Sequence, residues 1–196
     1  MILTDYCKDL TLSSNHPVDF NQSASLGVET WSVPAHRFEL DWSSTPIFSN
    51  VEQRKLFAYL DNLKKGQVTF NWLLPIHSEP NGLANANPFL FQSASAGQTS
   101  VVIEKSDEVY SFLSMGDLIK FSNHTKVYMV TNEVAGENPT VELNAPLKVG
   151  LSVSDSMITR NVEMTVRADP DFDGASYSRK AGDLHTSFTA RFLEVV

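Results

Sequence analysis

Apolar and polar residues alternate at every second position in four separate segments of this chain, residues 38–42, 68–72, 162–166 and 188–192. A period of two places successive side chains on opposite faces of a β-strand. Each segment is therefore predicted to be a strand with one buried face, in a sandwich or a barrel. The predicted fold class is mainly β.

A single segment has the helical period instead. Its apolar residues are Val51, Leu56, Tyr59, Leu60 and Leu63. Ser49 and Glu52 have the spacing of a capping box, in which the serine hydroxyl accepts a hydrogen bond from the amide three residues later. Gly66 supplies a residue that readily adopts the left-handed conformation beyond a helix end. These signals predict one α-helix at about 50–65.

The middle of the chain differs in composition from both ends. Residues 78–98 are dense in Ser, Pro, Asn, Gly and Ala, which predicts a long connection that residues 88–91 dock to a core. The short strand candidates that follow are Ser100–Glu104, Leu118–Phe121, Lys126–Thr131 and Thr140–Leu143. The predicted architecture is a β-sandwich with one α-helix, discontinuous over 1–92 and 152–196, with an inserted small β-barrel at 93–151.

The acidic balance of the chain limits what it is expected to bind. Among 196 residues it has 15 basic and 23 acidic side chains, a formal net charge of −8. A negative field repels phosphate, so specific binding of nucleic acid through a basic surface is not expected. Membrane insertion is not expected either, because no apolar run of about 18 residues is present. The single cysteine, Cys7, cannot form an internal disulfide, which suits assembly in a reducing cytoplasm.

One acidic segment has the spacing of a calcium loop. Asp169, Asp171 and Asp173 occupy its first, third and fifth positions, and Gly174 occupies the sixth, where a sharp turn is needed. The twelfth position holds Lys180 instead of the bidentate glutamate, and the preceding segment has the period of a strand. An EF-hand is therefore excluded, and a solvated acidic connection is predicted. Irregular calcium binding by residues 169–174 stays open.

No local signature of catalysis is present. The chain has no Gly-x-Ser-x-Gly turn and no glycine loop for phosphate. The five histidines are His16, His36, His77, His124 and His185, and they lack the close spacing of zinc ligands. His36 continues the apolar register of Phe38, which favours a packed histidine. We therefore predict a protein that is not an enzyme, with no catalytic residue, no metal ligand and no cofactor. One catalytic arrangement stays open, a pair of carboxylates that meet only in the folded chain.

The aromatic residues suggest an alternative function. Trp42 and Trp72 lie on apolar strand faces and are predicted to be core residues. Tyr110, Phe112 and Tyr128 belong to the inserted module and are predicted to be the exposed aromatic side chains. Because sugars stack on exposed aromatic rings, a carbohydrate-binding module is the alternative function.

The order of motifs along the chain is similar to that of a known family. The motifs are KKGQ at 64–67, GDLIKF at 116–121, KVYMV at 126–130, APL at 145–147 and TARFLEVV at 189–196. Over about residues 27–196, this order resembles the small tail proteins of tailed bacteriophages, of the distal tail protein type. The motifs consist of ordinary residues and carry no catalytic signature.

The resemblance implies a structural virion protein. Distal tail proteins of long-tailed phages form a sixfold ring at the end of the tail tube, within the baseplate, and join the tube to the hub and receptor-binding apparatus. Their ring domain is a β-sandwich with one helix, and many carry an inserted OB-like barrel. The partners that this implies are other copies in a hexameric ring, the tail tube protein, the tail hub and fibre proteins, and DNA that passes without specific binding.

The resemblance also implies a location, the tail tip of a virion assembled in the host cytoplasm. Tube, terminator and distal positions in the tail all use sheet-rich rings, so the choice among them stays open. The alternative is a carbohydrate-binding module of a phage or cell-surface protein.

Overall fold

The computed structural model describes residues 2–22, 28–32, 35–63, 66–104, 111–171 and 185–196, and the side chains of 19–34 are not described. The fold is mainly β, which confirms the predicted class. The chain divides into two compact units. Unit 1 comprises Met1–Ser14, Arg37–Pro75 and Met164–Val196, and unit 2 comprises Asn15–His36 and Ile76–Glu163. No helix in the described part of the chain has the length and hydrophobicity of a membrane-spanning helix.

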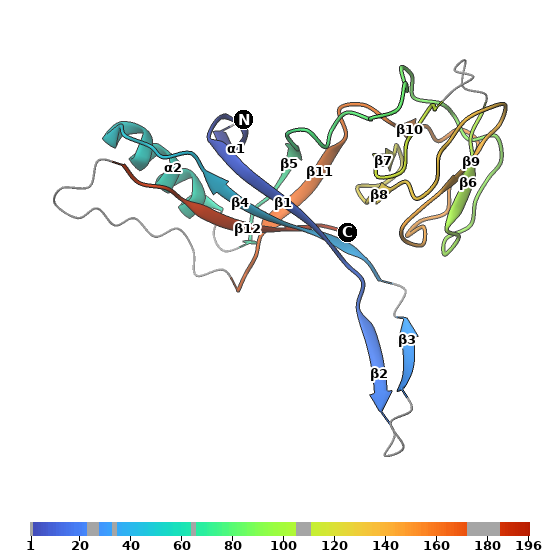
Figure 1. Ribbon diagram of the computed structural model, residues 1–196, viewed down its shortest axis with the longest axis horizontal. Coiled ribbons are helices and arrows are strands. Elements are labelled where there is room, and N and C mark those ends of the chain that lie inside the picture. The colour runs from blue at the N-terminus through green and yellow to red at the C-terminus, as the bar shows by residue number, and fades with distance from the viewer. Residues whose placement is uncertain (1, 23–27, 33–34, 64–65, 105–110, 172–184) are drawn as a thin grey trace. The chain divides into compact units, whose positions relative to one another are not determined.

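Unit 1 is built on one five-stranded sheet with the order β1-β4-β12-β11-β5 (Figure 1). Its strands are β1 (Cys7–Asn15), β4 (Arg37–Ser44), β12 (Thr189–Glu194), β11 (Glu163–Ala168) and β5 (Thr69–Leu73). The central strands β4, β12 and β11 pair antiparallel. This order makes β1 and β5 the two edge strands, although they come from the first and second quarters of the chain.

One face of this sheet is the core of unit 1. The apolar face predicted from the sequence is confirmed there, since Leu40, Trp42, Trp72 and Phe192 are all buried. The rings of Trp72 and Phe192 meet edge to face at 5.4 Å between centroids. Packing of aromatic rings in this geometry adds to the hydrophobic contribution of their burial.

The layer over this apolar face includes a short helix, α1 (Ile2–Asp5), that the sequence did not predict. The indole Nε1 of Trp42 donates to the Leu3 carbonyl at 3.1 Å, and that of Trp72 donates to the Thr4 hydroxyl at 3.1 Å. The two facing sheets of the predicted sandwich are not found, because the described strands of unit 1 form a single sheet. Helices supply the cover that a second sheet would give.

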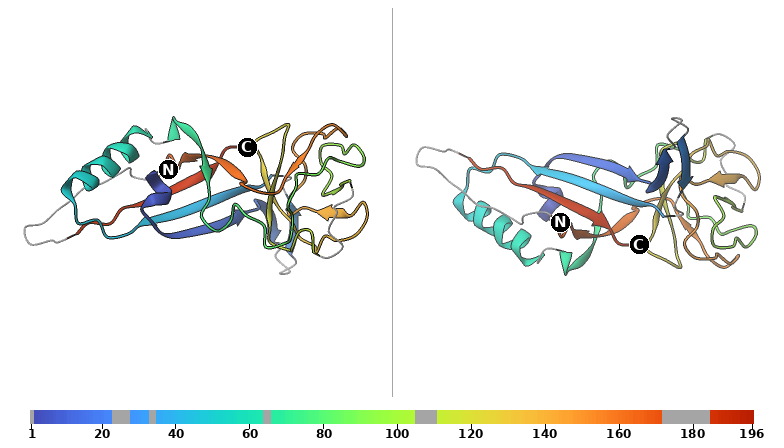
Figure 2. Two further views of the ribbon diagram at one scale, coloured as in Figure 1. Left: turned by 90° about the horizontal axis from the view of Figure 1, so that it is seen from above. Right: turned by 90° about the horizontal axis from the view of Figure 1, so that it is seen from below.

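Helix α2 spans Asn50–Asn62 and lies beside the sheet in both views of Figure 2. Ser49 is its N-cap, and the Ser49 hydroxyl accepts from the Glu52 amide at 3.4 Å, as predicted. Gly66 has a φ of +84°, the left-handed conformation expected beyond the helix. The predicted apolar stripe is wrong at its start, because Val51 is 75% exposed and the polar Gln53 is fully buried.

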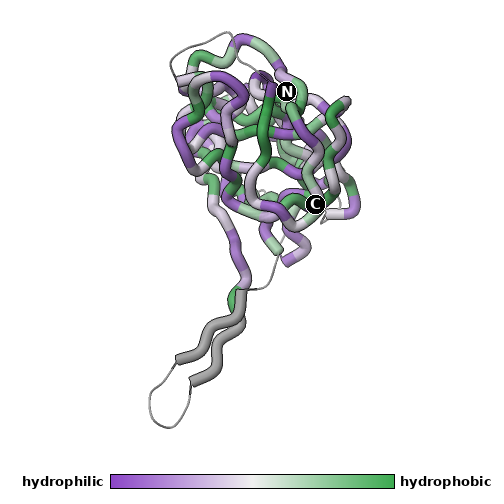
Figure 3. The backbone as a smooth tube through the Cα atoms, turned by 90° about the vertical axis from the view of Figure 1, so that its right-hand side faces the viewer, coloured by the Kyte–Doolittle hydropathy of each residue, from purple (hydrophilic) through white to green (hydrophobic). Residues whose placement is uncertain are grey.

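The described part of unit 2 contains three small sheets. The β2–β3 hairpin joins β2 (Val18–Gln22) to β3 (Val28–Ser32). A second pair joins β6 (Ser100–Val102) to β9 (Thr140–Glu142), and a three-stranded sheet has the order β10-β7-β8. The last three strands are β7 (Leu118–Phe121), β8 (Val127–Met129) and β10 (Met157–Ile158). Figure 3 colours the backbone by hydropathy and shows hydrophobic and hydrophilic residues interspersed along the described chain.

The predicted barrel in the insert is wrong, since no sheet closes among the described strands. Strands of two to four residues are too short to tilt and pair around a full circle. The isolated bridge Val130↔Leu143 connects the ends of β8 and β9 instead, Leu90↔Ile103 joins segment 88–91 to the end of β6, and one apolar cluster fills the space between them.

The limits of unit 2 differ from those predicted for the insert, 93–151. Unit 2 includes residues 76–92 because Leu90 is buried in its core and the Leu83 amide donates to the Ser111 carbonyl at 2.9 Å. The neighbours Phe89 and Phe91 are half exposed. Docking of segment 88–91 therefore buries the Leu90 side chain and also uses backbone hydrogen bonds, such as that from the Met157 amide to the Pro88 carbonyl at 2.8 Å.

Candidate functional site

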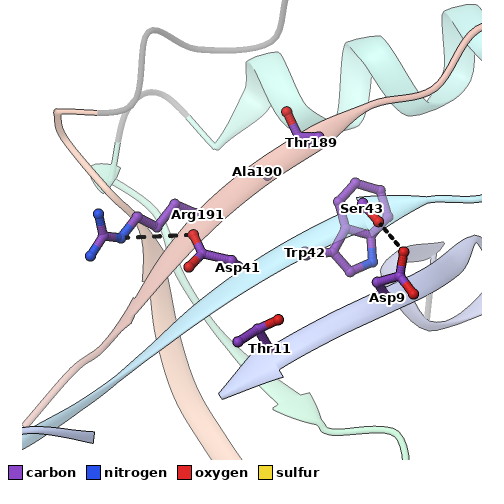
Figure 4. A pocket seen from close by; sticks show the side chains of 8 residues that line it. All are labelled: Asp9, Thr11, Asp41, Trp42, Ser43, Thr189, Ala190 and Arg191. Atoms are coloured by element: carbon purple, nitrogen blue, oxygen red, sulfur yellow. Dashed lines mark hydrogen bonds and ion pairs between the residues drawn. The ribbon is translucent and has the colours of Figure 1, made fainter. Parts of the chain in front are cut away.

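A hollow of about 400 Å³ lies on the polar side of the unit 1 sheet. Its lining residues come from β1, β4 and β12 and are Asp9, Thr11, Asp41, Trp42, Ser43, Thr189, Ala190 and Arg191 (Figure 4). Three neighbouring strands thus contribute to one surface, although β12 is about 150 residues from β4 in the sequence.

Strand register explains why these side chains meet. Ser43 lies opposite Thr189, and Asp41 lies opposite Arg191, on the paired strands β4 and β12. Residues opposite one another on an antiparallel pair point to the same face, so both pairs share the polar side. The Ser43 hydroxyl donates to the Asp9 carboxylate at 3.2 Å, which brings β1 into the surface.

The strongest electrostatic feature of this face is Glu39, whose side chain is only 7% exposed. Its carboxylate accepts from Arg37 Nε at 3.0 Å and from the Arg37 terminal nitrogen at 2.9 Å, and it also accepts from Arg191. Arg191 is shared further with Asp41 at 3.9 Å and with Asp169 at 3.5 Å. The hydrogen bond that Arg191 donates to Glu39, together with the negative charge of Glu39, raises the pKa of Arg191 above its ordinary value, with smaller contributions from the two aspartates.

This arrangement suits the binding of a polar partner. Arg191 is already held by carboxylates, so an incoming anion would have to compete with them. Ser43 faces the exposed Asp9 rather than a histidine, and none of the described lining residues is a histidine that could activate the hydroxyl. The hollow presents hydrogen-bond donors and acceptors together with positively and negatively charged side chains, all on one sheet.

The first residue of the acidic segment 169–174, Asp169, interacts with the ion-pair network around Arg191. One Asp169 oxygen accepts from the Asp171 amide at 3.0 Å, and the other faces Arg191. Residues 172–174 and Lys180, which complete the calcium-loop spacing, lie outside the described residues. Within the described ranges, no three His, Cys, Asp or Glu side chains are grouped as a metal site requires.

A second hollow, of about 300 Å³, lies in unit 2. Its lining residues are Glu79, Pro80, Gly82, Leu83, Ala84, Asn85 and Arg160. An ion pair of 2.9 Å joins Glu79 to Arg160. Buried Asp117 fixes the backbone of the loop at residues 79–85. Its carboxylate accepts from the Asn81 backbone amide at 2.7 Å and from the Gly82 backbone amide at 3.2 Å. The sequence shows only an aspartate in GDLIKF, with no signal for these distant donors.

The aromatic residues proposed for sugar binding are placed differently from the prediction. Phe112 and Tyr128 are buried in the core of unit 2, so the prediction that they are exposed is wrong. Tyr110 lies outside the described residues. The prediction that Trp42 and Trp72 are core residues is confirmed.

The structure brings His16 and His36 into contact with each other. Their rings are tilted by 46° with centroids 4.5 Å apart, and His124 Nε2 lies 3.0 Å from the Tyr128 hydroxyl. Burial lowers the pKa of His124, although the nearby Asp155 acts in the opposite direction. The predicted burial of His36 is confirmed, since it is 7% exposed.

Comparison with known proteins adds no relative. A search against known protein families finds no match, and a search of curated protein sequences finds none at a significant level.

Proposed function

We propose that this chain is a structural, non-catalytic subunit of a phage tail tip. Copies of it would form a ring, hexameric as in the distal tail proteins that it resembles, and the ring would join the tail tube to the hub and the receptor-binding apparatus. The observation that carries this proposal is the long open edge of the unit 1 sheet at β1.

Strand β1 is suited to contact another protein chain. With nine residues it is the longest strand among the described residues, and most of its side chains are exposed. As the first strand in the sheet order, it has one side that faces no other strand of this sheet. Such an edge is a template for pairing with another chain. Charges are confined to Lys8 and Asp9, so residues 10–15 present an uncharged edge.

A ring requires that each copy offers two different surfaces, one to each neighbour. The unit 1 sheet has two different edges, β1 and β5, and a polar face with the hollow described above. A contact between β1 of one copy and a different surface of the next is of the heterologous kind that closes into rings. The net charge of −8 fits a ring through which DNA passes without sticking.

Size-exclusion chromatography with light scattering tests the assembly. The wild-type chain is expected as a species of six times its 21.8 kDa mass. Two matched variants, Ser13→Pro and Ser14→Pro, test the contact at β1. Successive amides of a strand point to opposite sides, so one proline removes a donor toward β4 and the other removes a donor on the open side.

The variant that keeps the wild-type melting temperature is expected to lose the ring, because its proline blocks only the open side. Two results contradict the proposal. One is a wild-type chain that stays monomeric at every concentration, and the other is a ring that survives in both proline variants.

A further inference from the structure

Two histidines stand at the base of the β2–β3 hairpin. His16 precedes β2 and His36 follows β3, and their rings are in contact, tilted by 46° with 4.5 Å between centroids. His36 is buried, at 7% exposure, whereas His16 is exposed. Both belong to unit 2, as do Asn144 and Lys126. The ends of the hairpin are therefore held by a buried ring.

The partner of His36 has a fixed orientation. The side-chain oxygen of Asn144 accepts from the Met129 backbone amide at 2.9 Å. The backbone amide of Asn144 donates to the Met129 carbonyl at 2.9 Å. Strand β8 thus determines which end of the Asn144 side chain is oxygen. The nitrogen end lies 3.1 Å from His36 Nε2.

This orientation determines the proton on His36. The Asn144 side-chain nitrogen is only a donor, so His36 Nε2 must accept and carries no proton. The neutral ring then has its proton on Nδ1. A second proton on Nε2 would set two donors against each other and break the contact with Asn144.

Burial and the charges around His36 also disfavour its protonation. Burial lowers its pKa most, and the positive charges of Lys126 and His16 lower it further, to about 3. Lys126 is itself buried and donates to the Val127 carbonyl at 2.7 Å. Protonation of His36 would therefore add a positive charge near a buried ammonium group.

We propose that His36 and Asn144 form an acid-sensitive clasp that holds the β2–β3 hairpin to the rest of unit 2 at neutral pH and opens when Nε2 of His36 is protonated. The folded pKa lies below the ordinary value of 6.5, so the clasp is at full strength above pH 6.5 and is lost as the pH falls toward 3. Its opening constant rises about tenfold for each pH unit below 6.5, about 100-fold at pH 4.5. This inference goes beyond the proposed function and does not depend on it.

The tautomer and the titration are measured by nitrogen-15 NMR of the histidine rings. The expected result is a proton on Nδ1 of His36 at pH 7 and a titration midpoint clearly below the ordinary value of 6.5. Hydrogen exchange of residues 15–36, corrected for the intrinsic rate at each pH, is expected to show the acid opening.

In the variant Asn144→Asp, the group that faces His36 Nε2 becomes a hydrogen-bond acceptor instead of a donor. It keeps the oxygen that accepts from Met129 and replaces the donor nitrogen with a carboxylate oxygen, which accepts from a protonated His36. The midpoint of His36 is expected to rise above 6.5, and the hairpin is expected to stay protected at pH 4.5. The control is His77→Gln, which removes another histidine of unit 2 and should leave the acid response unchanged.

Three results would overturn the clasp: a proton on Nε2 at pH 7, a wild-type midpoint near 6.5, or the same acid opening in Asn144→Asp. The two NMR results need only the wild-type chain, so a variant that does not fold leaves the test intact. A failure of ring assembly would change none of these readings, because they concern contacts within one chain.

Discussion

Replacement of Glu39 by glutamine tests the ion-pair network on the polar face of the unit 1 sheet. Glu39→Gln keeps the shape of the side chain but removes its charge. The carboxylate joins Arg37, on its own strand, to Arg191, on the paired strand β12. It is nearly buried, at 7% exposure, whereas both arginine side chains are 45% exposed.

The expected cost is a loss of about 2 kcal/mol in the free energy of unfolding. Removing one partner of a fully buried ion pair costs about 3–5 kcal/mol, and a hydrogen bond to a charged group contributes about 1.5–3 kcal/mol. The value expected here lies below the first range because the half-exposed arginines regain water when the carboxylate charge is lost. The neutral amide also keeps one acceptor for an arginine.

Urea denaturation followed by tryptophan fluorescence measures this cost. The chain has three tryptophans, and Trp42 and Trp72 are in the core of unit 1. A Trp31→Phe background removes the third, so that the fluorescence reports unit 1 alone. The midpoint should fall while the slope with denaturant stays constant, which indicates a change in stability and not in the denatured state.

The matched control is Asp41→Asn, which removes another carboxylate near the same arginine. The Asp41 side chain is 61% exposed, and its oxygen lies 3.9 Å from Arg191 Nε. An exposed pair of this kind contributes between about 0 and 1 kcal/mol. If Asp41→Asn costs as much as Glu39→Gln, or if Glu39→Gln has no effect, the reasoning from burial is refuted.

Two further predictions concern the backbone. Gly66→Ala should destabilise unit 1 by more than about 2 kcal/mol, because the new Cβ would lie 2.4 Å from the Ala168 carbonyl at a φ of +84°. Gly97→Ala, at a φ of +89° with no atom within 4 Å, should cost only about 1–2 kcal/mol, and equal losses in urea denaturation would contradict this. Ile76→Asn should raise the melting temperature by about 2–4 °C. Ile76 has a φ of 70° and is 91% exposed, so asparagine relieves backbone strain without loss of burial. A lower melting temperature in calorimetry would show that no strain is present.

Local patterns in the sequence were sufficient for the elements of regular period. The alternation from Phe38 to Trp42 and the cap at Ser49 depend on neighbours within a few residues, so one sequence window contains their cause. The helix stripe shows the limit of such windows. Val51 and Gln53 are both near the helix start, and the choice of Gln53 for burial depends on the Ile47 carbonyl, to which its side-chain nitrogen donates at 2.6 Å.

The candidate site was not visible in the sequence. The alternation in residues 38–42 places Glu39 and Asp41 on the face opposite the buried one, whereas Glu39 is nearly buried. Its burial depends on Arg191 from the end of the chain, and no period or spacing relates two residues so far apart. The same holds for buried Asp117, whose amide donors Asn81 and Gly82 precede it by about 35 residues.

The sequence by itself determined that the chain forms strands with one apolar face, one capped helix and a middle segment of different composition, because backbone period and side-chain chemistry act between near neighbours. Only the tertiary structure decided the sheet order, the single sheet in place of a sandwich, and the open strands in place of a barrel. It also decided that His36 meets Asn144. These features depend on contacts between distant residues, whose pairing follows from the packing of the whole unit and has no local pattern.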